Sequence, residues 1–286
     1  MANNLVLDIV KAMRIATWNV NSARTRVDRM ADFLSRHEVD VLAVQETKCT
    51  DKNFPADRFT DLGYEVAHVG YSQWNGVAIL SRVGLVDVTD HFDGQPGFAK
   101  SNDPADEKVE ARAVAATCGG VRVVSLYVPN GRGLTDPHYQ YKVRWLWRLR
   151  DVVADKLAER PDALMALMGD FNIAPRDQDV WDRAFFEGKT HVTEPERAAF
   201  QGLEEAGLTE VTRQFTEEPR YTYWDYTAMR FQRNQGMRID FQLASSQLAR
   251  RARRGFIDVA ERDGKGASDH APVVVDYELG DFDAVR

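Results

Sequence analysis

The apolar residues of this 286-residue chain fall into two kinds of segment. Short continuous runs predict buried β-strands, and they cover residues 14–18, 39–45, 113–117, 121–126, 163–168, 221–224, 237–244, 256–259 and 273–277. Segments with apolar residues at helical spacing predict amphipathic helices, and they cover residues 24–37, 138–159 and 197–205. Because helices alternate with strands along the whole chain, we expect an α/β (α+β) fold.

Two glycine-containing turns indicate that part of the predicted sheet structure is antiparallel. Gly119-Gly120 separates two of the runs, and Trp74-Asn75-Gly76 precedes the apolar residues 77–80. Both are hairpin signals. Hairpins interleaved with helices predict mixed sheets, and two mixed β-sheets packed face to face with helices outside fit this order best. The periodicity alone does not separate that arrangement from one doubly wound sheet.

Composition indicates a single domain. The hydrophobic content of 44% suffices for a large core, and the least structured stretch, residues 91–108, has motif-bearing segments on both sides. We expect one domain over residues 13–280, with an N-terminal leader at 1–12 and a C-terminal tail at 281–286.

Two further features bear on location. Cys49 and Cys118 lack metal-ligand spacing and are expected to be reduced thiols. The apolar residues 5–10 are too few for a signal peptide, and no run reaches transmembrane length. We therefore expect a cytoplasmic protein without a membrane partner.

Polar side chains stand where five predicted strands begin or end. Asp170 and Asn172 follow one strand and are two residues apart, so strand-like alternation projects both from one side. Each polar residue alone could be an ordinary turn residue. Because catalytic groups tend to lie on loops held by a rigid sheet, five such ends together indicate a site along one sheet edge. The others are Asn19, Glu46, Asp240, Asp269 and His270.

Six short motifs carry a resemblance to a known family. They are Trp18-Asn19-Val20-Asn21, Gln45-Glu46-Thr47-Lys48, Tyr127-Val128-Pro129-Asn130-Gly131, Gly169-Asp170-Phe171-Asn172, Arg238-Ile239-Asp240 and Ser268-Asp269-His270-Ala271-Pro272. In this order they resemble the exonuclease III family of DNA-repair AP endonucleases, within the wider endonuclease/exonuclease/phosphatase superfamily. The resemblance implies a four-layer αββα sandwich made of two similar halves. It also implies an Mg²⁺-dependent nuclease, with Mn²⁺ as a substitute ion, that cuts double-stranded DNA 5′ to abasic sites and trims 3′ ends as a 3′–5′ exonuclease.

Phosphodiester cleavage needs a nucleophilic water, stabilisation of charge at the phosphorus, and a route for the leaving oxygen. Mg²⁺ suits the second task and prefers one or two carboxylates. We assign Glu46 and Asp269 to the metal, with Asn19 adjacent. Asp170 is assigned to water activation as general base, and Asn172 to positioning the phosphate or the water. These last two residues are also candidates for a second metal position.

His270 is expected to act together with Asp240. Asp269 precedes His270 directly, so in an extended chain their side chains diverge and they cannot pair. A carboxylate from Asp240 would fix the imidazole tautomer and favour its protonated form beside a phosphate. The resemblance places the phenol of Tyr127 near the scissile phosphate, with Asn130 beside it.

Trp224 leaves two alternatives open, and Asn21 departs from the pattern of the family. Trp224 either packs in the core or, as the resemblance implies, lies against the abasic sugar in a pocket that a normal nucleotide cannot fill. Asn21 stands where some relatives carry an acid, so no additional carboxylate is expected there.

The net charge of −7 argues only superficially against a nucleic-acid partner, because clustered arginines matter more than the total. Arg24 and Arg26, and likewise Arg230 and Arg233, flank motif strands, and we expect these four to contact the DNA backbone. The cluster at residues 250–254 is more typical of a solvated helix end.

Two other classes of function compete with the nuclease. A phosphatase or phospholipase on the same scaffold is the alternative enzyme, since a fold does not fix its substrate. A non-catalytic binding module is the third class, but every expected catalytic residue type is present. We expect a monomer that acts on double-stranded DNA with abasic sites or blocked 3′ ends. The sequence does not decide whether endonuclease or exonuclease activity dominates.

Overall fold

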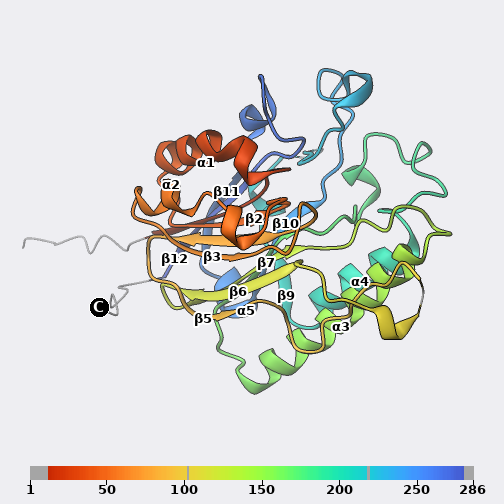
Figure 1. The fold of residues 1–286 in the computed structure, drawn as a ribbon, viewed down its shortest axis with the longest axis horizontal. Helices are drawn as coiled ribbons and strands as arrows, with labels where there is room; N and C mark the ends of the chain where they lie inside the picture. The colour runs from red at the N-terminus through yellow and green to blue at the C-terminus, as the bar shows by residue number, and fades with distance from the viewer. Residues whose placement is uncertain (1–11, 102, 218–219, 280–286) are drawn as a thin grey trace, which may run out of the picture.

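The computed structural model describes residues 12–101, 103–217 and 220–279, and they form two β-sheets with helices outside (Figure 1). Residues 1–11 of the predicted leader and the predicted tail at 281–286 lie outside the described residues. Ala12, which was assigned to the leader, already belongs to the first strand.

One six-stranded sheet has the order β11-β12-β1-β2-β4-β3. Its strands are β1 (Ala12–Asn19), β2 (Val41–Gln45), β3 (Glu65–Val69), β4 (Val77–Ser81), β11 (Ala252–Ile257) and β12 (Val273–Glu278). Only the β1–β2 pair is parallel.

The second six-stranded sheet has the order β5-β6-β7-β8-β10-β9. Its strands are β5 (Val86–Thr89), β6 (Ala113–Cys118), β7 (Val121–Tyr127), β8 (Met165–Asp170), β9 (Leu208–Glu210) and β10 (Asp240–Ser245). Again one pair is parallel, β7–β8, with antiparallel strands on both sides. The two halves therefore repeat one pairing pattern.

The three predicted helices form close to their expected limits. They are α1 (Ala23–His37), α3 (Pro137–Glu159) and α4 (Glu194–Glu205), and two short helices, α2 (Ala56–Thr60) and α5 (Ser246–Ala249), accompany them. The Asp136 carboxylate accepts from the His138 N–H at the start of α3, and Thr193 and Glu196 cap each other's backbone N–H groups at the start of α4. Both starts are favourable because side chains satisfy N–H groups that lack helical partners.

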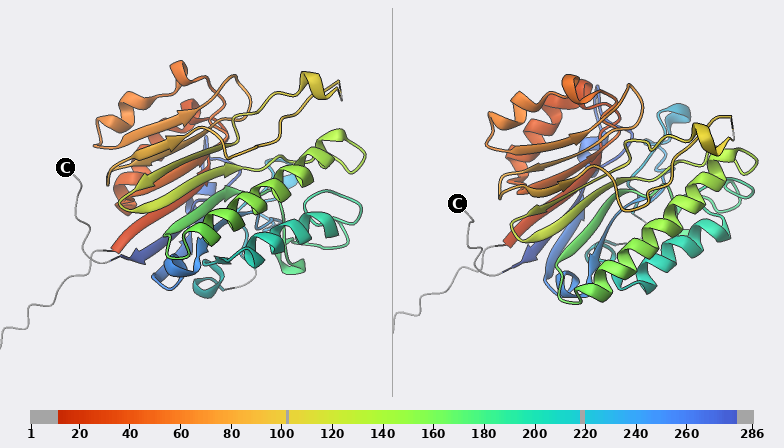
Figure 2. Two further views of the ribbon diagram at one scale, coloured as in Figure 1. Left: turned by 90° about the horizontal axis from the view of Figure 1, so that it is seen from below. Right: turned by 60° about the horizontal axis from the view of Figure 1, so that its bottom comes forward.

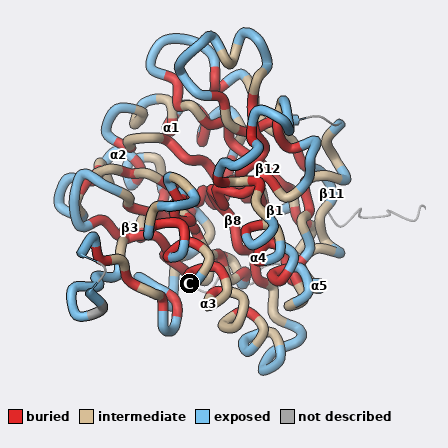
Figure 3. Tube along the Cα trace, turned by 90° about the vertical axis from the view of Figure 1, so that its right-hand side faces the viewer, coloured by how far each residue is buried: buried red, intermediate tan, exposed pale blue. Residues whose placement is uncertain are grey.

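Three apolar cores hold the layers together. One lies between the two sheets, a second joins α3 and α4 to the β7–β8–β10 sheet, and a third joins α1 and α2 to the β1–β2 sheet. Figure 2 shows α3 and α4 side by side on one outer face and α1 with α2 on the other. The four-layer αββα prediction is confirmed, and Figure 3 shows the buried strands surrounded by exposed loops.

Two predicted strands differ from the structure. Residues 221–224 form no strand, because Tyr223 makes only isolated bridges to Met237 and His270. The strand predicted from Met237 begins at Asp240 instead. Both hairpins are confirmed, with β6 paired to β7 and β3 paired to β4. Within the described ranges no helix is both long enough and apolar enough to cross a membrane.

Candidate active site

The polar strand ends meet at one edge of the sandwich. Tyr127 and Asp170 are partners in the parallel β7–β8 pair, and Asp240 is the partner of Asp170 in the antiparallel β8–β10 pair. Asn19 ends β1 in the other sheet, opposite Gln45 and next to Glu46. Since both sheets present these ends on the same side, the polar groups converge between them.

The backbone at this edge is unusual. Gly169 has φ +145°, and a Cβ at that position would collide with the carbonyl oxygen of Leu126, so only glycine fits directly before Asp170. Glu46 and Asn172 both have φ +52°, in the left-handed region that non-glycine residues seldom adopt. Such conformations are retained where the surroundings fix them and are concentrated at functional sites.

Asn19 bridges the two sheets. Its Nδ2 donates to Glu46 Oε1 at 2.9 Å and to Asp170 Oδ2 at 3.0 Å, while its Oδ1 accepts from the Asn21 N–H at 3.0 Å. That backbone donor fixes which side of the amide is oxygen. In this orientation Asn19 holds two carboxylates. A place for Asn19 beside the metal stays a prediction.

His270 lies between two buried carboxylates. Its Nδ1 is 2.8 Å from Asp240 Oδ2, and its Nε2 is 3.8 Å from Asp170 Oδ2. Asp240 Oδ2 also accepts from the Thr222 hydroxyl at 2.6 Å. The pair that was predicted from strand ends is therefore in contact, and all three ionisable groups are at most 4% exposed in their side chains.

The carboxylates keep the imidazole charged. Burial acts to lower the pKa of His270, but Asp240 and Asp170 outweigh it and raise the pKa above its ordinary value. Burial raises the pKa of Asp170, against the opposing effect of His270 and with the help of Asp240 and Glu46. A carboxyl group with a raised pKa is suited to accept a proton near neutral pH.

Glu46 stays ionised. Burial acts to raise the pKa of its carboxyl, but the Lys48 ammonium, 2.8 Å from Oε2, and the Asn19 amide together lower it. Lys48 also donates to Asn21, whose Nδ2 donates to Asp269 at 3.0 Å. Lys48 belongs to the motif Gln45-Glu46-Thr47-Lys48, but the sequence predicted no role for it.

The oxygen groups here fit a hard cation. Among the described residues, Glu46, Asp170 and His270 bring one oxygen or nitrogen atom each to within 4.8 Å of one another. Because both nitrogens of a protonated imidazole are donors, the two carboxylates are the candidate ligands of this group. Carboxylate oxygens are the ligands that Mg²⁺ prefers. Because Asp240 and Glu46 also raise the pKa of Asp170, a cation at this point would relieve their mutual repulsion.

Tyr127 and the asparagines complete the edge. Burial, then the Glu46 carboxylate, raise the pKa of Tyr127 well above its ordinary value, so the phenol stays a donor. The Asn130 amide donates to Asn172 Oδ1 at 3.1 Å, and the Asn172 N–H donates to Asp170 Oδ1 at 2.8 Å.

Comparison with known proteins agrees with this geometry. The Endonuclease/Exonuclease/phosphatase family matches residues 16–270. This chain belongs to that family. Exodeoxyribonuclease III of Haemophilus influenzae is 27% identical over 278 residues, which cover 93% of this chain and all of the relative. The DNA repair nuclease APEX1 of Danio rerio is 29% identical over 92% of this chain and 81% of the relative.

Solved structures of the Endonuclease/Exonuclease/phosphatase family superpose on almost the whole chain. A Neisseria 3′ phosphatase, NExo, bound to a product DNA hairpin, has a TM-score of 0.83 and 36% identity and covers 94% of this chain and all of its own. An AP endonuclease from Archaeoglobus fulgidus has a TM-score of 0.84 and 32% identity and covers 93% of this chain and all of its own.

Asp269, the second metal ligand expected from the family motif, lies apart from the Glu46–Asp170–His270 group. It is absent from the set of three close ligand atoms found in the described part of the chain. Its carboxylate accepts from Asn21 and from the Ser268 hydroxyl, at 3.0 and 3.5 Å. A metal role for Asp269 stays a prediction.

Of the adjacent aromatic residues Tyr223 and Trp224, Tyr223 lies beside His270. The Tyr223 ring lies 4.9 Å from the His270 ring. Trp224 is 2% exposed, packs against Phe231, and donates from Nε1 to Asn234. This placement favours the packing alternative for Trp224, and its contact with an abasic sugar stays untested.

The four arginines expected to contact DNA differ in their surroundings. Arg24 and Arg233 are exposed. Arg26 instead donates to the carbonyl oxygens of Asn21, Gly266 and Ala267, and ties α1 to the loop before Asp269. Arg230 lies over the rings of Trp181 and Phe185, at 4.7 and 4.8 Å. Contact of any of them with DNA stays a prediction.

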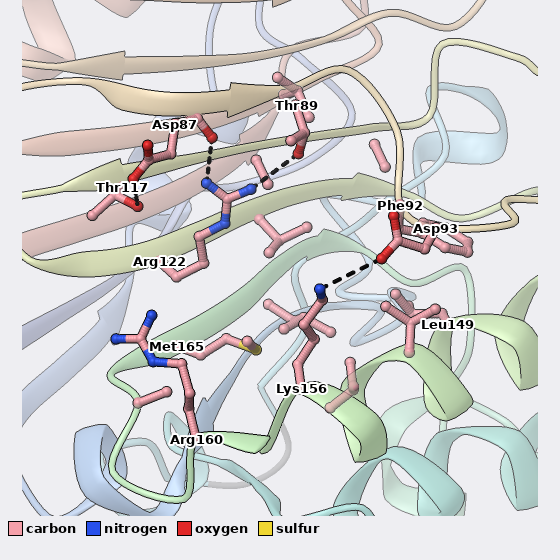
Figure 4. Close-up of a pocket in the computed structure, with 18 of the residues that line it drawn as sticks. Asp87, Thr89, Phe92, Asp93, Thr117, Arg122, Leu149, Lys156, Arg160 and Met165 are labelled. Atoms are coloured by element: carbon pink, nitrogen blue, oxygen red, sulfur yellow. Dashed lines mark hydrogen bonds and ion pairs between the residues drawn. The ribbon is translucent and has the colours of Figure 1, made fainter. Parts of the chain in front are cut away.

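A separate hollow of about 750 Å³ lies at the opposite ends of β7 and β8, between β5, β6 and the end of α3 (Figure 4). Arg122, Lys156 and Arg160 surround its apolar floor. Arg122 donates to the Asp87 carbonyl and the Thr89 hydroxyl, and Lys156 lies 3.5 Å from Asp93. No residue of the candidate active site lines it.

Proposed function

We propose that this protein hydrolyses phosphodiester bonds in double-stranded DNA, cutting 5′ to abasic sites and trimming 3′ ends. The observation that carries the proposal is the convergence of Glu46, Asp170 and His270, from both sheets, within 4.8 Å. Similarity to exodeoxyribonuclease III and to an AP endonuclease supports the DNA substrate.

In the proposed reaction, Asp170 takes the proton from the attacking water. Its carboxylate is oriented on both oxygens, by the Asn172 N–H on Oδ1 and by Asn19 on Oδ2. Burial raises its pKa toward that of a base suited to neutral pH. Asn19 also donates to Glu46 Oε1. The amide thus holds the Glu46 and Asp170 carboxylates side by side, and they need not share a proton.

His270 and Tyr127 stabilise the negative charge that develops on the phosphate. Asp240 raises the pKa of His270 and so maintains the imidazolium. Burial and Glu46 raise the pKa of Tyr127 and so maintain the phenol. Fixed donors of this kind act strongly because they need no reorganisation during the reaction. Asn130 and Asn172, joined by a hydrogen bond, orient the phosphate or the water.

We further propose Mg²⁺ as the cofactor, with Mn²⁺ able to substitute. Glu46 would hold it, with Asp170 beside it, and Asp269 is the additional ligand that the family motif suggests. When bound, the ion supplies Lewis-acid stabilisation of the phosphoryl oxygens. We also propose that the protein is monomeric and cytoplasmic. Its similarity to the bacterial exodeoxyribonuclease III supports the cytoplasmic location.

A second activity, removal of 3′-terminal phosphates, is favoured by one observation. The 36%-identical Neisseria structure is that of a 3′ phosphatase with a product DNA hairpin. The same water-activating and charge-stabilising groups would serve a phosphomonoester at a 3′ end.

One assay separates these activities from the alternative enzyme class. An abasic duplex, a duplex with a 3′-phosphate, an intact duplex with a recessed 3′ end and a soluble inositol phosphate are each incubated with EDTA, Mg²⁺ or Mn²⁺. We expect metal-dependent cleavage of the three DNA substrates and none of the inositol phosphate. Preferential cleavage of the inositol phosphate would replace the nuclease with a phosphatase.

A further inference from the structure

A buried ion pair lies directly behind the candidate active site. Lys142 of α3 and Glu196 of α4 have completely buried side chains, and Lys142 Nζ is 2.5 Å from Glu196 Oε1. The pair belongs to the two helices on the outer face of the sheet, and neither residue is among the groups expected to contact the substrate. A buried pair of this kind is weak evidence for stability, because desolvation of both charges offsets their attraction.

The ammonium group of Lys142 faces the backbone of the catalytic loops. Nζ donates to the Asn172 carbonyl oxygen at 2.6 Å and to the Asn130 carbonyl oxygen at 3.2 Å. These two residues belong to the loops after β8 and β7, and their side chains are joined at the site. One cation on α3 therefore ties both loops together from behind.

His191 adds a second donor to the same carbonyl. Its Nδ1 is 2.6 Å from the Asn172 oxygen, and since that oxygen can only accept, Nδ1 must carry a proton. Glu196 holds this donor in turn, because its Oε1 accepts from the His191 N–H at 2.9 Å and from the Thr190 hydroxyl at 2.5 Å. The Asn172 carbonyl thus has two fixed donors, both anchored by one carboxylate.

The two donors act on a residue in the left-handed conformation. Asn172 has φ +52°, a region that asparagine enters more readily than most other non-glycine residues, and the donors fix its carbonyl there. That conformation aims its N–H at Asp170 Oδ1, at 2.8 Å. A loosened carbonyl would release the Asn172 N–H and, with it, the orientation of the Asp170 carboxylate.

We propose that Lys142, Glu196 and His191 are positioning residues, which hold Asn130, Asn172 and thereby Asp170 in the geometry required for water activation. The inference rests on the proposed nuclease function. We expect the network to control the chemical step and not the binding of DNA, because Lys142 and Glu196 are completely buried and His191 contacts the loop through the Asn172 carbonyl oxygen.

The test uses Lys142→Met combined with Glu196→Gln in the full chain. Both charges are removed together, so no uncompensated charge stays buried. We expect kcat on abasic duplex to fall about 10- to 100-fold, the range seen for residues that orient catalytic ligands, with KM changed less than about twofold. Peptide-level hydrogen exchange should accelerate at residues 128–131 and 169–173.

The control is Arg14→Met with Asp276→Asn, which removes an ion pair between β1 and β12 that does not contact these loops. It should leave kcat and exchange in both loop peptides unchanged. If both double variants lose kcat in proportion to their fall in unfolding temperature, the Lys142–Glu196 pair is merely structural and the inference is wrong. Unchanged kcat in the Lys142–Glu196 variant would also overturn it.

Two single variants cover the case in which the double variant does not fold. His191 has φ +82°, so His191→Gly removes the imidazole without backbone strain, and His191→Asn keeps an N–H donor at a similar distance. We expect the glycine variant to lose kcat and the asparagine variant to recover most of it; equal losses would contradict a donor role. If the wild-type protein cleaves no abasic DNA, the proposed function fails, and the exchange comparison alone decides the positioning role.

Discussion

The two ends of the paired sheets carry charged residues in opposite ways. At the active-site end, Asp170, Asp240 and His270 are almost fully buried and contact one another across different strands. At the other end, Arg14 of β1 pairs with Asp276 of β12, with side chains 25% and 14% exposed. Charges at the surface end are paired locally, whereas those at the active-site end are crowded.

The difference shows that the fold retains, at the active-site end, polar groups that do not favour its stability. Burying like-charged carboxyls raises the pKa of Asp170 and leaves Asp240 Oδ1 without a hydrogen-bond partner in the described residues. At the other end the hydrogen bond to Asp276 raises the pKa of Arg14, so this guanidinium favours its charged form. Strongly perturbed ionisable groups in contact mark functional sites more often than structural ones.

The largest effect is expected from Glu46→Gln. Because Glu46 lies at the end of β2 and its carboxylate faces Asn19 and Lys48, the change removes a charge without emptying the core. We expect cleavage of abasic duplex to fall on the order of 10²- to 10³-fold, as for removal of one charge-stabilising group, with the unfolding temperature kept. Calorimetry should show weakened Mg²⁺ binding; unchanged affinity would rule out Glu46 as a ligand.

The coupled pair of Asp240 and His270 gives the next largest effect. The raised pKa of His270 depends on Asp240, so Asp240→Asn should lower it. In the proposed reaction the protonated imidazole is the active form, so activity should fall as pH rises through its pKa. The alkaline limb of the pH–rate profile should therefore move to lower pH, with about a 10- to 100-fold loss at neutrality.

A double-mutant comparison tests whether the two residues act as a unit. In a His270→Asn background, Asp240→Asn should add little further loss. Because macroscopic pKa values belong to the whole site, this comparison is stronger than the profile alone. Multiplicative losses would mean that the two residues act independently, despite the 2.8 Å contact.

The sequence identified the strands that supply the site, but not every side chain that completes it. Asp240 and His270 could be paired from the sequence because both stand at ends of predicted strands, and these ends were expected to meet at one sheet edge. Tyr223 could not be separated from Trp224, because residues 221–224 form no regular strand and alternation does not apply. Lys142 was hidden because it lies on the buried face of α3, and its partner Glu196 is 54 residues away.

Local signals explain what was predicted correctly. The helical spacing of apolar residues predicted α4, which begins three residues before the expected Arg197, and the two-glycine turn predicted the β6–β7 hairpin. The short strands β3, β5 and β9 were missed because polar residues interrupt them and no continuous apolar run remains. What the sequence did not supply were the contacts of Lys142 and Glu196, which depend on how α3 and α4 pack behind the site.

Tyr223 and Trp224 differ in a measurable way. Trp224→Ala empties a buried site, so it should destabilise the fold by about 3–5 kcal/mol and reduce abasic incision and 3′-phosphate removal equally. Tyr223→Ala removes the ring beside His270 and should reduce abasic incision more than 3′-phosphate removal, with a smaller effect on unfolding. Selective loss of abasic incision in Trp224→Ala would restore the substrate role expected from the family resemblance.

The smallest effect is expected from Asp276→Asn, which repeats at the other end of the sheets the chemical change made in Asp240→Asn. The Arg14–Asp276 pair is partly exposed, so solvent screens it and its loss should cost about 1 kcal/mol or less of unfolding free energy. Cleavage of abasic duplex and its pH profile should match the wild type, because Arg14 and Asp276 make no contact with the catalytic groups. Urea unfolding and the pH–rate profile are measured on both variants side by side. A shifted alkaline limb in Asp276→Asn would show that charge at the far end reaches the active site, and the contrast between the two ends would then be wrong.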